Sequence, residues 1–359
     1  MSIVFLILQV VIVIGFLIFF HELGHFIAAR SVGVPVEEFG FGYPPRLTKI
    51  AEWKGTEITL NWIPFGGFVR PKGEGDETVE GGMAAAPAWK RLVIAISGPL
   101  MNFLIGIIIL VVIYSAIGIP ASNEAMITQV TSGSPAMEVG LQPGDTILAV
   151  NDEPIENINE LINTVNANVG EEISLTLQRN GEIETLTITP RVDPPEGEGA
   201  MGVALSNPLE PTPFFQSVGF AFEATGFVIK ETLMLPIRLI RGNIDPAVAR
   251  PVGYKGIYDI YSQAREMDQE TTMPTAEPLP VFTLSIVANI SLALGITNLL
   301  PIPALDGGRI LFTLPEFIIK KRIPQELKNA INTVSFLLLI LLMVVITILD
   351  FTNPIVIPR

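Results

Sequence analysis

The chain has 359 residues, of which 49% are hydrophobic and only 16% charged, and its mean hydropathy is +0.51. Soluble globular chains carry about 25% charged residues, so this composition excludes a disordered or fibrous protein and favours a membrane protein. The net charge of −14, without a run of Lys and Arg, argues against nucleic-acid binding. The absence of cysteine excludes disulfides, cysteine–zinc sites, iron–sulfur clusters and thiol nucleophiles.

Four apolar stretches are long enough to cross a bilayer, for which about 20 residues are needed. We expect transmembrane helices within residues 1–30, 92–119, 281–310 and 331–352. The first is not a cleavable signal peptide, because it lacks a basic start and a small-residue cleavage site, and its apolar run is too long.

Basic residues flanking the spans gather in two loops, residues 31–91 and 311–330. The positive-inside rule therefore predicts that both loops are cytoplasmic. The N-terminus, the segment 121–205 and the C-terminus are then expected on the outer face. In the loop 31–91, β-branched and aromatic residues around a Pro/Gly break predict a β-element that dips into the membrane face.

Most of the negative charge lies in residues 121–200, which hold 14 acidic residues against two arginines. This shift in composition predicts a soluble domain, 121–205, inserted between membrane segments. Alternating apolar and polar residues around Asn180-Gly181 predict a hairpin, and residues 157–167 predict a helix. We therefore expect a small α/β domain.

Residues 206–280 are interpreted as a linker that contains an amphipathic helix at 213–242. Three charged residues interrupt its apolar run, and Pro236 is expected to break its second half. These features favour a helix lying in the membrane interface over a fifth span.

The sharpest signal is the sequence His21-Glu22-Leu23-Gly24-His25. Two histidines at i and i+4 lie on one helix face, so both imidazoles can reach one Zn²⁺. Glu22 lies beside them and can take a proton from water, whose pKa a bound zinc lowers to about 7. A chance match is a poor explanation, because the chain has two histidines in all and ionisable groups in an apolar span are costly unless paired or metal-bound.

A catalytic zinc takes three protein ligands and keeps one open position. With no third histidine and no cysteine, the third ligand is expected to be a carboxylate, and Asp306 in the apolar run 298–311 is the candidate. The alternative roles for Asp306 are a helix cap or a partner for Arg309. Asp350, at the far end of the last span, is interpreted as a solvated boundary residue. His21 and Asp306 reach the same membrane face if the helix at 213–242 does not cross.

Five segments carry a resemblance to a known family: HELGH at 21–25, SGPLMNF at 97–103, GLQPGDTILAVN at 140–151, PVGYKGI at 251–257 and NLLPIPALDGGRIL at 298–311. In this order they resemble the site-2 protease family of intramembrane zinc metalloproteases, in its bacterial regulator-of-sigma-E-protease-like form with one PDZ domain. The resemblance implies a multi-pass α-helical membrane protein with four transmembrane helices, an inserted α/β PDZ-like domain and a membrane-associated β-loop.

The resemblance also implies residue roles. His21, His25 and Asp306 are expected to bind one Zn²⁺, and Glu22 is expected to be the catalytic base. The same resemblance implies that three residues hold the substrate strand near the metal: Asn298, Pro301 and Pro303. Two points stay open at this stage. The family often has glycine where this chain has Arg250, which either faces solvent or alters the local structure. The PDZ-like groove, closed by residues 199–203, either binds peptide or only filters substrates by size.

The function implied is regulated intramembrane proteolysis in a bacterial plasma (inner) membrane. Substrates would be single-span membrane proteins already cleaved on the outer side, either anti-sigma-factor-like proteins or signal-peptide remnants. The expected partners are such a substrate and the lipid bilayer, with no nucleic acid. The alternatives are a PDZ membrane scaffold, which would not need Glu22, and a metal transporter, which would need polar residues along spans such as 92–119 and 331–350.

Overall fold

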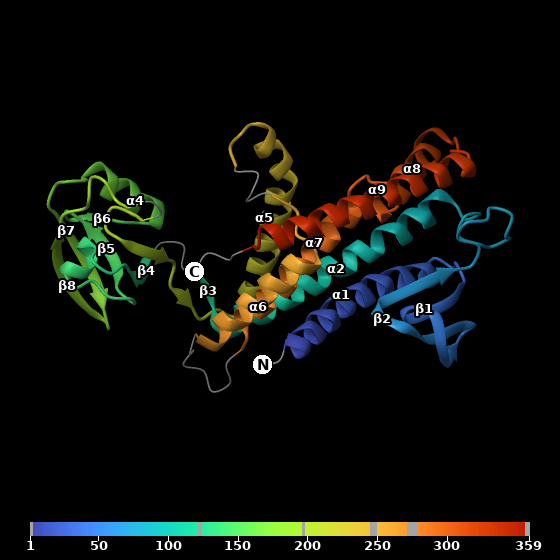
Figure 1. The fold of residues 1–359 in the computed structure, drawn as a ribbon, viewed down its shortest axis with the longest axis horizontal. Coiled ribbons are helices and arrows are strands. Elements are labelled where there is room, and N and C mark those ends of the chain that lie inside the picture. Colours follow the sequence, from blue (N-terminus) through green and yellow to red (C-terminus); the bar gives the residue numbers. More distant parts are fainter. Residues whose placement is uncertain (1–2, 121–123, 196–197, 245–249, 271–278, 356–359) are drawn as a thin grey trace. The chain divides into compact units, whose positions relative to one another are not determined.

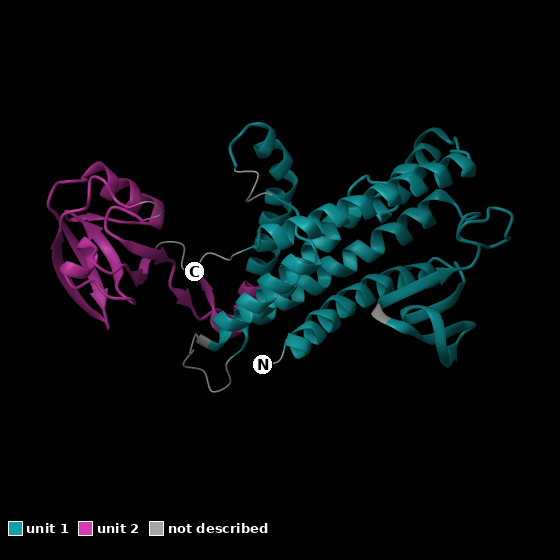
Figure 2. Ribbon diagram, in the orientation of Figure 1, with its two compact units in different colours: residues 1–113, 218–359 teal, residues 114–217 magenta. Residues whose placement is uncertain are grey.

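The computed structural model of the chain describes residues 3–120, 124–195, 198–244, 250–270 and 279–355 (Figure 1). The chain forms two compact units: Met1–Ile113 with Val218–Arg359, and Tyr114–Ser217 (Figure 2). Residues 121–123 of the predicted inserted domain, and residues 245–249 and 271–278 of the predicted linker, lie outside the described residues.

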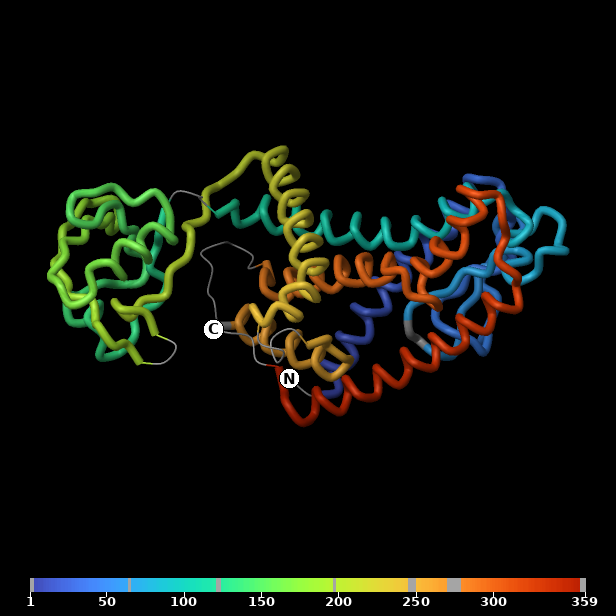
Figure 3. The backbone as a smooth tube through the Cα atoms, turned by 90° about the horizontal axis from the view of Figure 1, so that it is seen from above, coloured from blue at the N-terminus to red at the C-terminus, as the bar shows by residue number. Residues whose placement is uncertain are grey.

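Unit 1 contains four helices that are long and apolar enough to cross a membrane: α1 (Ile3–Ser31), α2 (Ala88–Ile117), α7 (Val281–Leu299) and α9 (Gln325–Thr352). Their axes are roughly aligned in two perpendicular views, with α2 and α9 running opposite to α1 and α7 (Figures 1 and 3). The four predicted spans are therefore confirmed as apolar helices over the described part of the chain.

The predicted span at 281–310 is wrong in its last 11 residues, 300–310. Helix α7 ends at Leu299, the next six residues leave the helical path, and a separate helix, α8 (Asp306–Ile319), begins at Asp306. Pro301 and Pro303 explain the interruption, because proline supplies no N–H to the helical ladder and disfavours helix in the residue before it. The predicted loop 311–330 is likewise occupied by the end of α8 and the start of α9.

The predicted linker 206–280 contains two helices, α5 (Phe214–Ile240) and α6 (Tyr254–Glu270). Helix α5 runs across the direction of the four apolar helices in both views (Figures 1 and 3). The expected break at Pro236 is wrong, because α5 continues through this residue to Ile240. A proline interrupts one backbone hydrogen bond, and the bonds on either side can carry a helix past it with a kink.

The loop between α1 and α2 folds into two long antiparallel strands, β1 (Val36–Trp53) and β2 (Thr56–Pro71). Residues 38–41 of β1 pair on one side with residues 57–60 and on the other with residues 67–70. This double pairing leaves residues 67–70 as an outer strand of a small curled sheet, which packs against α1 through Phe19, Phe26 and Phe39. The expected β-element is present.

Glycines bring the apolar helices close together. A Cβ on Gly24 of α1 would collide with the carbonyl oxygen of Ser97 in α2. A Cβ on Gly106 of α2 would lie 2.6 Å from Leu292 of α7. The side chain of Ser291 also donates a hydrogen bond to the carbonyl of Asn102, at 2.8 Å. Small residues at helix contacts allow this approach in a membrane protein.

Unit 2 is built around a six-stranded sheet in the order β8-β7-β5-β4-β9, with β6 beside β5. Its strands are β4 (Ala125–Val130), β5 (Thr146–Val150), β6 (Glu153–Pro154), β7 (Ile173–Arg179), β8 (Glu182–Ile188) and β9 (Val203–Ser206). Two short strands, β3 (Ile119–Pro120) and β10 (Leu209–Glu210), pair where the chain enters and leaves the unit.

Two helices cover this sheet, α3 (Pro135–Glu138) and α4 (Ile158–Ala167). The predicted helix at 157–167 is confirmed, and Asn157 caps α4 by accepting the Glu160 N–H at 3.0 Å. The predicted hairpin is also confirmed: β7 and β8 are joined by Asn180 and Gly181, which both have positive φ, as a two-residue turn of this kind requires.

A buried ion pair ties the start of β5 to the end of β7. Asp145 is fully buried, and Arg179 donates to both of its carboxylate oxygens at 2.7 Å. The Gln142 N–H donates to the same carboxylate at 2.8 Å. Burial by itself raises the pKa of Asp145, but these hydrogen bonds outweigh it and hold the pKa below its usual range.

The pH dependence of unit 2 tests this pair. Because the folded pKa of Asp145 is depressed, its contribution to stability is complete above the unfolded pKa of about 3.9 and is lost as pH falls through the folded value. We expect Asp145→Asn to destabilise unit 2 by about 3 kcal/mol at neutral pH and to reduce its acid sensitivity, measured by hydrogen exchange of β5 and β7 amides. Asp152→Asn, at an exposed position, is the matched control. Equal exchange in both variants would contradict the role of the pair.

Candidate metal centre

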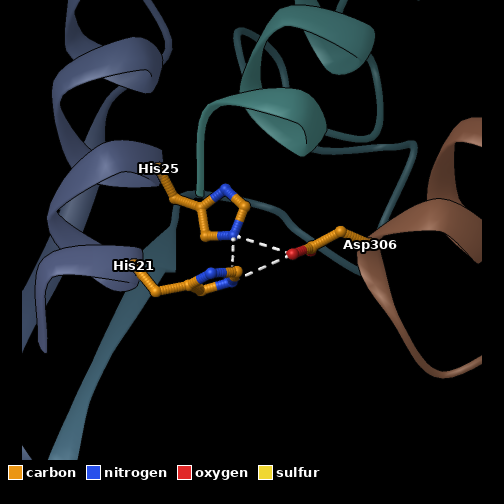
Figure 4. Close-up of side chains that lie close together, drawn as sticks. All are labelled: His21, His25 and Asp306. Carbon is orange, nitrogen blue, oxygen red and sulfur yellow. Dashed lines mark hydrogen bonds and ion pairs between the residues drawn. The ribbon is translucent and has the colours of Figure 1, made fainter. Parts of the chain in front are cut away.

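Three buried side chains from two helices meet at one point. His21 and His25 lie one turn apart near the C-terminal end of α1, and Asp306 is the first residue of α8 (Figure 4). His21 Nε2 lies 3.0 Å from Asp306 Oδ2, His25 Nε2 lies 3.2 Å from the same oxygen, and the two Nε2 atoms are 3.1 Å apart. The predicted pairing of the two histidines with Asp306 is therefore present in the fold.

The other ring nitrogen of each histidine has its own partner. His25 Nδ1 lies 2.7 Å from the Ile94 carbonyl, which can only accept, so Nδ1 carries the proton and Nε2 keeps a free lone pair. His21 Nδ1 lies 3.1 Å from Nδ2 of Asn102, and the Oδ1 of this amide is buried without a partner among the described residues, which favours the orientation with O and N exchanged. With the amide oxygen turned to the ring, Asn102 accepts Nδ1–H and leaves Nε2 of His21 free as well.

Helix α2 supplies the space that the two rings need. A Cβ on Gly98 would collide with Nε2 of His25 and lie 2.8 Å from Nε2 of His21. Glycine at this position lets the α2 backbone approach the point at which the ligand atoms converge. Because Gly24 allows the close contact of α1 with α2, the two glycines together fix the histidines against α2.

The break between α7 and α8 positions Asp306. Gly307 and Gly308 directly follow Asp306. A Cβ on Gly307 would collide with the Leu300 carbonyl, and a Cβ on Gly308 would lie 2.6 Å from the Ile302 carbonyl oxygen. The residue Ala304 has a φ of +73°, which is uncommon for a non-glycine residue. Its N–H is held by Asn332 of α9 at 3.1 Å.

The donor set fits a zinc ion. Two imidazole nitrogens and one carboxylate oxygen are three protein ligands of the kinds that catalytic zinc sites use. Zinc bonds of about 2.0–2.1 Å at tetrahedral angles separate neighbouring ligand atoms by about 3.3 Å. The observed separations of 3.0–3.2 Å are close to this value, and all three side chains are buried.

Glu22 faces the same region and contacts the small sheet. Its Oε2 accepts a hydrogen bond from the Val69 N–H of β2 at 3.2 Å. Since this N–H points to Glu22 and not to β1, Val69 presents its backbone to the outer edge of the sheet. In antiparallel strands the N–H and C=O of a residue point to the same side, so the Val69 carbonyl lies on that edge too.

Two cavities reach the site. One of about 780 Å³ is mostly apolar; it touches His21 and Glu22 and is walled by α1, α7 and the middle of α9. The other, of about 320 Å³, is mostly polar and touches His21, Glu22, His25 and Asp306. Both are lined by Asn298. One side of the three-residue cluster therefore faces apolar space and the other faces polar space.

The three residues expected to position substrate are placed differently. Asn298 lies at the end of α7 and lines both cavities. Pro301 is exposed and Pro303 half-buried, and neither lines these two cavities. The prolines shape the turn that brings Ala304 and Leu305 into the cavity wall.

The interpretation of Asp350 as a solvated residue is wrong. Its side chain is fully buried, and its Oδ2 accepts the N–H groups of Gly253 and Gly256. Arg250 does not face solvent freely either: its side chain is 15% exposed and lies 3.7 Å from Asp350 Oδ1. The carboxylate is buried because the N-terminus of α6 supplies the donors that water would otherwise supply.

Sequence reasoning missed several residues of the site. Gly98 and Asn102 lie in the SGPLMNF motif, which by itself assigns them no role, and Val69 lies in the loop 31–91, for which only a β-element is predicted. The sequence does mark Gly98 and Asn102 as unusual, because glycine is unfavourable in a helix and asparagine is polar within the apolar span of α2. Their roles depend on which helix lies opposite, and the sequence does not give this.

Comparison with known proteins gives a consistent picture. The sequence model of peptidase family M50 matches residues 9–342 of the chain. A Clostridium perfringens protein whose given name includes the words zinc metalloprotease is 33% identical over 344 residues, covering 94% of this chain and 96% of the relative. Zinc metalloprotease RasP of Geobacillus kaustophilus is 26% identical over 422 residues, covering 95% and 96%.

Two further similarities were found. The regulator of sigma-W protease RasP of Bacillus subtilis is 26% identical over 420 residues, covering 94% of this chain and 96% of the relative. Among solved structures, the PDZ domain of an SdrC-like protein from Listeria monocytogenes matches with a TM-score of 0.22 and 20% identity. That match covers 24% of this chain and 90% of the solved one.

Gly98→Ala tests how the histidines are placed. Alanine normally favours a helix over glycine, but here its methyl group would push on both ring nitrogens. We expect zinc affinity to fall about 10–100-fold, measured as zinc per chain after dialysis against buffered zinc. Gly219→Ala in α5, where a Cβ would meet no other atom within 4 Å, is the matched control. Unchanged zinc affinity in Gly98→Ala would contradict the assigned packing.

Proposed function

Since the chain belongs to peptidase family M50, the site-2 protease family of zinc metalloproteases, we propose that it cleaves single-span membrane proteins within the bilayer. His21, His25 and Asp306 hold the zinc ion in this proposal, and Glu22 is the catalytic base. The observation that carries it is the convergence of three buried ligand atoms at 3.0–3.2 Å beside Glu22.

Zinc in this site would polarise the scissile carbonyl as a Lewis acid and lower the pKa of water to about 7. The residues of the chain supply the rest. The Glu22 carboxylate takes a proton from the attacking water and passes it to the nitrogen of the leaving amine. The Val69 N–H holds Glu22 Oε2, which leaves the other carboxylate oxygen free for the proton. Ile94 and Asn102 keep the histidine rings in the orientation that points Nε2 at the metal.

The outer edge of the small sheet is a suitable place for the substrate backbone. A transmembrane helix hides its amide groups in internal hydrogen bonds, so it must unwind before a peptide bond can be attacked. An unwound segment can add to the outer edge of residues 67–70 as a further strand, with the Val69 carbonyl accepting a substrate N–H while the Val69 N–H stays on Glu22. Backbone hydrogen bonds of this kind tolerate many sequences. Asn298 lies across the cavity and can hold the substrate from the other side.

The two cavities suit a membrane substrate. The larger, apolar cavity is walled by α9 side chains such as Leu339, Ile340 and Val344, and it has room for an apolar segment that enters from the lipid. The polar cavity offers a path for the water that hydrolysis consumes. Exposed apolar side chains on β1 and β2, including Ile50, Trp53 and Trp62, support the proposal that this sheet lies in the membrane face.

The remaining regions are assigned by the same reasoning. Helix α5 lies across the spans and exposes Phe215, Phe222 and Phe227, which supports a position in the membrane interface. Unit 2 is proposed to be a PDZ-like domain on the outer face, with a cavity of about 300 Å³ between α4 and β9. We also propose that the N-terminus and the C-terminus lie on the outer face. A relative named regulator of sigma-W protease favours anti-sigma-factor-like substrates, already trimmed on the outer side, with signal-peptide remnants as the second candidate.

Glu22→Gln tests the proposed base. The amide keeps the size of the side chain and leaves the three ligands in place, but it cannot take the proton. We expect cleavage of a co-expressed, tagged single-span substrate with a short ectodomain to fall about 10²–10⁴-fold, with zinc content unchanged.

Glu37→Gln, at an exposed position of β1, is the matched control and should cleave like the unsubstituted chain. Equal cleavage by Glu22→Gln would show that another group is the base. Loss of zinc in Glu22→Gln would show that Glu22 is a ligand instead.

A further inference from the structure

Helix α9 is held at its two ends by polar contacts. Near its start, Asn332 accepts the N–H of Ala304, beside the metal-binding Asp306. Near its end, Asp350 is fully buried and accepts the N–H groups of Gly253 at 3.0 Å and Gly256 at 2.9 Å. A buried carboxylate is costly without partners: here Oδ2 accepts two N–H groups, while Oδ1 makes no hydrogen bond to a described residue and lies near the Arg250 guanidinium.

Asp350 acts as a helix cap supplied by another helix. The Ile257 N–H bonds to the Gly253 carbonyl, so Gly253 is the N-cap of α6 and Gly256 its third residue. The N-cap N–H and the third N–H are groups that a helix cannot satisfy internally, and in a capping box two side chains of the same helix bind them. Here one carboxylate from α9 binds both.

Gly253 and Gly256 have no side chain, which leaves room for the Asp350 carboxylate. A Cβ on Gly253 would lie 2.7 Å from Asp350 Oδ2, and a Cβ on Gly256 would lie 3.1 Å from both carboxylate oxygens. Arg250 completes the surroundings, 3.7 Å from Asp350 Oδ1, and donates to the Asn353 carbonyl just beyond α9. We call this group, Arg250, Gly253, Gly256 and Asp350, the α6–α9 clamp.

The clamp joins two walls of the substrate cavity. Tyr254 directly follows Gly253 and lines the 780 Å³ cavity that reaches His21 and Glu22. Helix α9 contributes lining residues from Phe336 to Ile348. The middle of α9 therefore faces the cavity, while its two ends are fastened to other segments.

Apart from its ends, α9 is the most loosely packed of the apolar helices. In its most apolar window 11% of residues are buried, against 22% in α1, 22% in α2 and 39% in α7. A helix with so little buried surface is positioned mainly by its few specific contacts, and losing one of them frees it to move.

We propose that Asp350 is a positioning residue: through the α6–α9 clamp it holds α9 as the wall that presses the substrate segment toward Glu22. This proposal rests on the proposed proteolytic function. Asp350 does not touch the reacting atoms, so its loss should weaken the holding of substrate more than the chemical step.

The position of α9 can be measured without any substrate. Because the chain has no cysteine, Ile12→Cys in α1 and Leu338→Cys in α9 give a unique pair of spin labels at exposed sites. We expect Asp350→Ala to broaden the distance distribution between the labels and shift it to longer distances. Asp350→Asn, which keeps one acceptor oxygen for the two N–H groups, should restore most of the original distribution. Gly226→Ala in α5, where a Cβ would meet no other atom within 4 Å, is the matched control.

The kinetic consequence is measured on the full chain without labels. For a single-span substrate with a short ectodomain, we expect Asp350→Ala to raise KM about tenfold while kcat stays within about twofold and zinc content is unchanged. A residue that only stabilises the fold would lower zinc content and kcat together. If Asp350→Ala does not fold, Gly256→Ala displaces the carboxylate and is expected to give the same broadening.

Two results would overturn the proposal. An unchanged distance distribution in Asp350→Ala would show that the clamp does not position α9. A shifted distribution with unchanged KM would show that the position of α9 does not control substrate binding. Failure of the unsubstituted chain to cleave any membrane substrate would count against the proposed function instead, because the distance measurement does not depend on cleavage.

Discussion

The structure depends on the meeting of two imidazoles and one carboxylate inside an apolar helix bundle. Such groups are costly in a membrane interior unless they bind one another or a metal. The Nδ1 atom of His25 contacts the Ile94 carbonyl, and the Nδ1 atom of His21 contacts the Asn102 side chain. Asp306 is positioned as the first residue of α8. This arrangement requires α1 to lie directly against α2 and requires the chain between α7 and α8 to leave the helical path beside them.

Both requirements are met by residues without large side chains. Gly24 and Gly98 let α1 and α2 approach, and Gly307 with Gly308 lets the start of α8 fold back on the turn before it. The interrupted helix borders a polar cavity through Ala304, Leu305 and Asp306, and non-helical backbone at membrane depth is tolerated beside such a cavity. The same cavity reaches Glu22, so the break that places the third ligand also opens the space in which a peptide bond can be attacked.

Much of this could be predicted from the sequence, for reasons that are local. The spacing of His21 and His25 follows from the helical period, Asp306 follows from the lack of any other suitable ligand, and the β7–β8 turn follows from Asn180-Gly181. The missed features depend on what lies opposite. Gly98 has a purpose only because the histidines face it, and Asp350 is buried only because α6 presents its N-terminus there. Helix α6 lies within the predicted linker 206–280, because its polar sequence lacks the apolar run that predicts a span.

The central claim, that His21, His25 and Asp306 together bind a catalytic zinc, is tested most directly by X-ray absorption at the zinc edge on the purified chain. We expect one zinc per chain with nitrogen and oxygen neighbours at about 2.0–2.1 Å, and loss of that zinc in Asp306→Ala. Full zinc occupancy with unchanged neighbours in Asp306→Ala would contradict it, because the third ligand would then have to come from elsewhere.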